Sequence, residues 1–232
     1  MKISETTMGV LKNFALIHHS LIVNEPKCIV TMSRARNVVA VFDTEEEFPV
    51  KFGIYTLREF LAAVALFDLA ETDFDFKDKW VRVKYKGSSI KYSYTRIEHI
   101  ENSERYKPSE KYKGFSHFDC KFPLSEEHVL RIKRASAVMF GSSDYTNVRI
   151  FSDGAGEAFI KLDYDTDGMD PMANNFKVAL EGVDGKCNIN FNVEHLKLYK
   201  GNYDVSVLGN RMVKFAHTEL PLMYFIMAKV AK

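Results

Sequence analysis

The segment Asp163-Tyr-Asp165-Thr-Asp167-Gly168 has the acidic spacing of the first half of a calcium-binding loop. The twelfth position of such a loop would be Asn174, where a bidentate Glu is needed, so an acidic surface loop is the better interpretation. His18 and His19 are adjacent and would point to different faces of a helix, unlike metal-binding histidines four residues apart. We therefore expect no metal site and no cofactor.

The residues of nucleophilic catalysis also show no known pattern. Cys28, Cys120 and Cys187 are far apart and form no CxxC pair, which indicates reduced intracellular thiols rather than disulfides or a zinc site. The sequence has no phosphate-binding loop, no GxSxG motif and no cysteine with a local histidine signature. We expect no catalytic residues and no enzyme, although scattered Asp, His and Ser side chains could still converge in space.

The remaining chemistry is electrostatic and comes from basic side chains on expected helices. In the helix expected over residues 125–140, Val129, Ile132, Ser136 and Met139 form a core stripe. The basic positions outside the core stripes of the four expected helices are Lys12, Arg58, Arg131, Lys133, Arg134, Lys197 and Lys200. The acidic residues gather in strands and loops at 45–47, 73–78 and 163–170. A basic surface made of helices suits loose, sequence-independent contact with phosphates, whereas ordinary solvated helix faces are the alternative.

The total charge limits what such a surface can do. The 232 residues carry 32 Lys and Arg against 31 Asp and Glu, so the formal net charge is only +1. A tight DNA binder usually has a clear basic excess, so this chain must either ignore nucleic acid or segregate its charges by face. Aromatic residues do not alternate with the basic positions, which argues against a groove that stacks single-stranded bases.

The elements that would carry these residues occur in a repeated order. Helices are expected over residues 4–18, 56–67, 125–140 and 192–199, the second of them opening with a capping box of Thr56 and Glu59. Several short strands follow each helix, and a charged stretch with Pro and Gly separates the halves. The order predicts an α+β fold of two similar domains, each with two helices packed on antiparallel sheet: residues 1–104, a linker at 105–115, and residues 116–232.

Segments in both halves resemble the sliding clamps of T-even-type tailed phages. The matching segments, whose order and spacing carry the resemblance, are Met1-Lys2-Ile3-Ser4, Leu11-Lys12-Asn13-Phe14-Ala15, Ile54-Tyr55-Thr56-Leu57 with Phe60-Leu61, Phe191-Asn192, and Lys200-Gly201-Asn202-Tyr203. The resemblance covers essentially the whole chain, except for weak detail over residues 68–121.

The resemblance implies a homotrimeric, ring-forming processivity factor in the cytoplasm of an infected host cell. Its implied partners are duplex DNA, a replicative DNA polymerase and an ATP-dependent clamp loader. The seven basic positions named above would line the central hole. A surface pocket for apolar partner tails would lie at Tyr106, Leu220, Pro221 and Leu222. The alternative hypothesis is a β-rich phage structural or scaffold protein without nucleic-acid binding.

Ring size and subunit contacts can be estimated from general geometry. Twelve helices, each about 10 Å across, would surround a hole about 28 Å wide, whereas eight would leave about 15 Å, which is too narrow for a duplex. Subunits should join through open sheet edges, and the candidate residues are Ile90, Tyr92 and Tyr94 in the first half and Phe176, Val178 and Leu180 in the second. The alternative is that both segments are interior strands. No apolar run approaches 18 residues, so no membrane span is expected.

Overall fold

The chain forms two compact units, Met1–Gly114 and Phe115–Lys232, in the computed structural model. The structure describes residues 1–106, 110, 114–115, 117–140, 146–164 and 175–229. Six residues of the expected linker and most of the calcium-like segment, residues 165–174, lie outside this range. No helix in the described range is long and apolar enough to cross a membrane.

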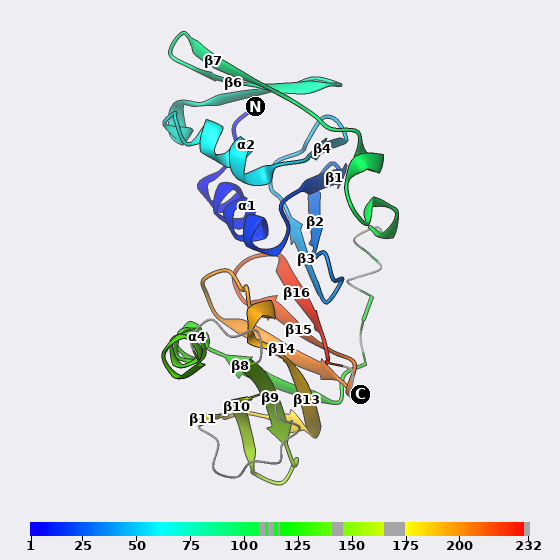
Figure 1. Cartoon of the computed structure of the whole chain (residues 1–232), viewed down its shortest axis with the longest axis vertical. Helices are drawn as coiled ribbons and strands as arrows, with labels where there is room; N and C mark the ends of the chain where they lie inside the picture. Colours follow the sequence, from blue (N-terminus) through cyan, green and yellow to red (C-terminus); the bar gives the residue numbers. More distant parts are fainter. Residues whose placement is uncertain (107–109, 111–113, 116, 141–145, 165–174, 230–232) are drawn as a thin grey trace. The chain divides into compact units, whose positions relative to one another are not determined.

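The first unit contains two helices and two antiparallel sheets. One sheet has the order β3-β2-β1-β4, formed by Val38–Asp43, Cys28–Met32, Leu21–Glu25 and Phe52–Ile54. The other has the order β5-β6-β7, formed by Asp73–Phe76, Trp80–Tyr85 and Ser88–Ser93. Helices α1 (Glu5–Ile17) and α2 (Leu57–Val64) pack against each other, and α1 contacts β2 and β3 (Figure 1).

Helix α1 begins where its sequence predicts. The Ser4 hydroxyl accepts a hydrogen bond from the Thr7 amide at 3.1 Å, which satisfies one of the free N–H groups at the helix start. Glu46 strengthens this end, because its carboxylate accepts the Ser4 amide at 2.6 Å and the Thr7 hydroxyl at 2.7 Å. Val10 and Phe14, four residues apart on one side of the helix, are fully buried and face the core.

Helix α2 exists, but its expected capping box does not. Thr56 makes no side-chain hydrogen bond to the helix start. The first helical amide, that of Leu57, instead donates to the His19 carbonyl at 2.7 Å, so the backbone of a neighbouring segment satisfies it. Glu59 is exposed on the helix surface.

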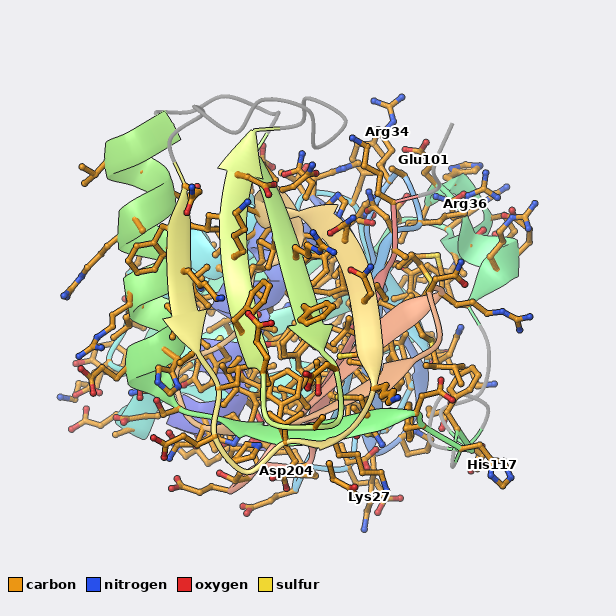
Figure 2. The ribbon with its side chains drawn as sticks, turned by 90° about the horizontal axis from the view of Figure 1, so that it is seen from below. Lys27, Arg34, Arg36, Glu101, His117 and Asp204 are labelled. Atoms are coloured by element: carbon orange, nitrogen blue, oxygen red, sulfur yellow. The ribbon has the colours of Figure 1, made fainter. Side chains whose placement is uncertain are left out.

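The second unit also contains two antiparallel sheets. One has the order β12-β8-β14-β15-β16, formed by Asp184–Gly185, Cys120–Leu124, Tyr203–Leu208, Met212–His217 and Leu222–Met227. The other has the order β11-β10-β9-β13, formed by Phe176–Ala179, Ala158–Tyr164, Thr146–Ser152 and Cys187–Asn192. Helix α4 (Glu126–Phe140) packs against β10 and runs beside β11 at the end of the four-stranded sheet (Figure 2).

The fourth helix expected over residues 192–199 is wrong. Only a single 3₁₀ turn forms there, Val193–His195. Leu196 and Leu198 are both buried, a spacing of two residues that an extended segment places on one side and a helix does not. The Tyr199 amide donates to the Tyr224 hydroxyl at 3.2 Å, and its carbonyl accepts the Tyr203 hydroxyl at 2.6 Å, so neither group is available for a helix.

The internal repeat is confirmed by the order of elements. In each unit a helix is followed by three strands, a further strand that completes the same sheet, a short helical element and three more strands; the second unit also has the two-residue strand β12 before its completing strand, and β8 before its helix. Strands β3-β2-β1-β4 correspond in order to β11-β10-β9-β13, and β5, β6 and β7 to β14, β15 and β16. Within the described residues, the second unit has the 3₁₀ turn where the first has α2, so it contains one α-helix instead of the two expected.

Candidate nucleic-acid interface

The helices of the first unit each expose one of the expected cations. On α1, Lys12 lies on a narrow exposed stripe with Glu5 and Leu16, while most other positions of the helix are buried. On α2, Arg58 is exposed beside Glu59. Neither Lys12 nor Arg58 forms an ion pair within the described part of the chain, so both charges face solvent.

Helix α4 exposes two arginines opposite its buried stripe. Val129, Ile132 and Ser136 are at most 8% exposed, as expected, while the Met139 side chain lies outside the described part. Arg131 and Arg134 are exposed, and the Arg131 guanidinium pairs with the Glu127 carboxylate one turn earlier. Such exposed pairs contribute little to stability, about 0.3–0.5 kcal/mol, but this one halves the free charge of the arginine pair.

Lys133 does not belong to this exposed set, which corrects the sequence-based assignment. Its side chain is half-buried, and its ammonium donates a hydrogen bond to the Leu198 carbonyl at 3.3 Å. Burial lowers the pKa of the Lys133 ammonium, because the charged form loses hydration there. Lys133 therefore holds the extended segment that replaces the expected fourth helix, rather than facing outward.

Lys197 and Lys200 lie on that extended segment and not on a helix. Lys197 is half-exposed and Lys200 is exposed. The backbone after Lys200 must be glycine, because Gly201 has φ +127° and a Cβ there would come within 2.2 Å of the His217 ring. The same imidazole lies 3.0 Å from the Lys200 carbonyl through its Nε2 atom. The backbone at Lys200 is thus positioned by a tertiary contact with strand β15.

The expected edge strands do lie at sheet edges. Strand β7 ends the three-stranded sheet and β11 ends the four-stranded sheet. Tyr92 packs on Phe60 of α2 with ring centroids 5.3 Å apart, and Tyr94, one residue beyond β7, stacks on Phe52 at 4.8 Å. Ile90 is half-buried, and Phe176, Val178 and Leu180 also turn toward the interior, so a neighbour would meet mainly the strand backbones. Their role as a subunit interface stays a prediction.

The expected pocket for partner tails is only partly exposed. Leu222 is 1% exposed in strand β16, so its side chain belongs to the core and cannot meet a partner in this conformation. Pro221 is exposed and Leu220 half-exposed, in a turn whose Glu219 and Leu220 amides both donate to His217 Nδ1 at 3.1 Å. Tyr106 is half-buried in the first unit. The apolar run at residues 220–222 could not by itself distinguish the core strand from the exposed turn.

The structure adds a groove that the sequence did not reveal, and it shows the basic turn around residues 34–37, which was assigned to no site. A groove of about 770 Å³ lies between α4 and β11, and it is lined by His128, Arg131, Arg134, Ala135, Val138 and residues 176–179. Val138 points away from the core stripe, which helical spacing could have revealed. Arg34 and Arg36 project from the turn between β2 and β3, with Arg34 paired to Glu101 at 3.2 Å (Figure 2).

Comparison with known proteins gives one close sequence relative and many similar folds. No family model matches the chain. A protein described as "Sliding clamp" from Vibrio phage KVP40 is 31% identical over 228 residues, covering 97% of this chain and 98% of the relative. A. fulgidus PCNA, solved with the C-terminal region of FEN-1, has a TM-score of 0.66 at 14% identity, covering 97% and 95% of the two chains.

The DNA polymerase III subunit beta of Borrelia burgdorferi has a TM-score of 0.69 at 14% identity. The match covers 97% of this chain and only 62% of that subunit, which is the longer protein. At these identities the two structures establish the fold alone, and they confirm the predicted clamp fold.

Proposed function

The chain belongs to the sliding-clamp family, and from that premise we propose that three copies close into a ring around duplex DNA and hold a polymerase there. The observation that carries the proposal is the 31% identity to the phage clamp along nearly the full length of both chains. Sliding clamps are DNA polymerase processivity factors, and this match argues against the alternative of a structural or scaffold protein. The chain itself would catalyse no reaction.

The proposed contact with DNA is weak and electrostatic. Lys12, Arg58 and Arg134 are exposed on helices and have no ion pair within the described residues. So few cations per copy suit a protein that must move along the duplex, since strong phosphate binding would slow it. Arg131 and Lys200 would add to this surface, whereas Lys133 would not.

The proposed ring is closed through the sheet edges β7 and β11. Edge strands leave backbone N–H and C=O groups unpaired, and pairing with another copy satisfies them. A hole surrounded by twelve helices requires four helices per copy, but the fourth expected helix is a 3₁₀ turn. The trimer is now supported by the family membership and the two edges rather than by that count.

The proposed partners act from outside the hole. A clamp loader would open the ring with ATP, and a polymerase would bind through a short apolar tail near Leu220 and Pro221, in the cytoplasm of the infected cell. In support, A. fulgidus PCNA has been solved with the C-terminal region of another protein bound to it. That likeness is one of fold, so the position of the tail on this chain is our own proposal.

Two measurements test the ring. Sedimentation at moderate concentration should give a trimer of the 26.6 kDa chain. After loading, the protein should remain on closed circular DNA and leave the same DNA once it is cut, because only topology holds it. A monomer across the concentration range, or equal retention on circular and linear DNA, would contradict the proposal.

A further inference from the structure

Two cysteines that are far apart in the sequence meet at the junction between the two sheets of the second unit. Cys120 begins β8 in the sheet β12-β8-β14-β15-β16, and Cys187 begins β13 in the four-stranded sheet. Both are free thiols, and they hydrogen-bond to each other. The fold therefore pairs two thiols that their positions in the sequence leave unrelated.

The backbone holds this pair of thiols in place. Gly185 is directly opposite Cys120 in the β12–β8 ladder. Cys187 follows two residues later and is opposite Ser152 in the β13–β9 ladder. The Ser152 hydroxyl donates to the Gly185 carbonyl at 2.8 Å, which ties the two ladders together. Since the thiols already touch across this junction, joining them requires rotation of the side chains rather than a new arrangement of the strands.

The two thiols differ in their access to solvent. Cys187 is 9% exposed and lines a groove of about 490 Å³ together with Asp119 and Lys186. Cys120 is only 1% exposed. A small molecule in the groove would therefore meet the sulfur of Cys187 first.

The two thiols also differ in how readily they ionise. Burial raises the pKa of both, that of Cys120 to about 12. For Cys187, hydrogen bonds from the Cys120 thiol and the Ser152 backbone oppose this rise, whereas for Cys120 the neighbouring Cys187 adds to it. Cys187 is thus the more accessible thiol and also the one whose thiolate has hydrogen-bond donors.

We propose that Cys187 and Cys120 form a reversible disulfide when the protein meets hydrogen peroxide, and that Cys187 is the sulfur oxidised first. The Cys187 thiolate attacks one peroxide oxygen, the O–O bond breaks, and the departing hydroxide takes up the thiol proton to become water. The Cys120 sulfur then attacks the sulfenic acid on Cys187, so that the S–S bond forms and the S–O bond breaks, and a second water leaves with the Cys120 proton. In total the two thiols lose two electrons and two protons, and the peroxide is reduced to two waters. Dithiothreitol reverses the reaction by thiol–disulfide exchange.

This disulfide joins the two sheets of the second unit covalently. It closes a loop over residues 120–187 that contains α4 and the strands β9, β10 and β11. Closing a long loop removes conformational freedom from the unfolded chain, so the oxidised protein should resist unfolding more than the reduced one. The proposal goes beyond the proposed function and does not depend on ring formation.

Peptide mapping of the full-length protein tests the pairing. After treatment with hydrogen peroxide, the protein is unfolded and alkylated without reductant. The free thiols should fall from three to one per chain, and one linked peptide should contain both Cys120 and Cys187. The urea midpoint of unfolding should rise, and dithiothreitol should restore the midpoint and all three thiols. The rate of thiol loss should rise about tenfold for each pH unit near neutrality, because the thiolate is the reacting form.

Three variants separate the roles of the thiols. Cys120→Ala should stop at the sulfenic acid of Cys187, which dimedone labels, whereas Cys187→Ala should leave Cys120 as a free thiol. Cys28→Ala, in the first unit, is the matched control and should form the disulfide as the wild type does.

The wild-type peptide map needs no substitution, so a variant that does not fold leaves the main test intact. The pairing is wrong if Cys120 and Cys187 of the peroxide-treated wild type are not linked, or are linked only when the chain is oxidised in urea. Dimedone labelling of Cys120 in Cys187→Ala would overturn the order of oxidation. An unchanged or lowered urea midpoint of the linked protein would contradict the stabilising effect of the disulfide.

Discussion

Replacing Lys133 with methionine should leave DNA binding unchanged, although sequence reasoning places this lysine in the central hole. The structure instead turns its ammonium inward to the Leu198 carbonyl, 3.3 Å away. Methionine keeps much of the aliphatic stem that packs there and removes a charge that burial disfavours. The lost hydrogen bond costs about 1 kcal/mol and the relieved desolvation offsets it, so the stability should change by less than about 1 kcal/mol.

The salt dependence of DNA binding distinguishes a lysine that contacts a phosphate from one that points into the protein. A lysine that contacts one phosphate contributes about 0.9 to the slope of log affinity against log salt concentration. Lys12→Met should therefore lower this slope by about 0.9 for each such contact, and Lys133→Met should leave it unaltered. Short linear duplex is the right substrate, because topology then contributes nothing and only direct contacts are measured.

Three results are informative in this comparison. Equal loss of slope in the two variants would show that Lys133 reaches the duplex and that its inward hydrogen bond does not persist in solution. If the slope is unchanged in both variants, Lys12 does not contact the duplex. Strong destabilisation of Lys133→Met in urea would show that its hydrogen bond to Leu198 contributes more than a typical one.

Three further changes test the local architecture. Tyr224→Phe should lower the free energy of unfolding by about 1–3 kcal/mol in urea, because it leaves the Tyr199 amide without its partner; an unchanged midpoint would refute that. Burial alone would raise the pKa of Glu46, but the hydrogen bonds from the start of α1 outweigh it and lower this pKa. The ionised Glu46 therefore contributes its full stabilisation above about pH 4.5 and loses it as the pH falls through the lowered pKa. Glu46→Gln should make the free energy of unfolding less dependent on pH in this range. Gly201→Ala should reduce the melting temperature, since the new Cβ meets the His217 ring at positive φ, and a neutral result would mean that the turn can relax.

Local signals in the sequence predicted the helices that depend on local chemistry. The Ser4 cap and the spacing of Val10 and Phe14 define α1 without reference to the rest of the fold. The same holds for α4, where Val129 and Ile132 are buried and Arg131 is exposed. The two strands offered as interface candidates, with interior strands as the alternative, lie at sheet edges as β7 and β11.

Elements set by distant contacts were beyond prediction. Residues 192–199 contain enough helix-forming residues to suggest a helix, yet Tyr203 and Tyr224, on two later strands, bind both backbone groups of Tyr199. Lys133 likewise looks exposed on a helical projection, and only the position of Leu198 turns it inward. The capping box at Thr56 is a sound local pattern, yet Thr56 makes no side-chain hydrogen bond to the helix, and the His19 carbonyl of another segment accepts the Leu57 amide.

The small number of unpaired helical cations bears on how such a ring would stay on DNA. With Arg131 paired to its own Glu127, the exposed helical cations left for the duplex are chiefly Lys12, Arg58 and Arg134. Three weak contacts per copy, screened within about 10 Å at moderate salt, cannot hold a protein on DNA. Residence time must then depend on how often an interface opens, so substitutions at β7 and β11 should shorten it far more than loss of any single phosphate contact.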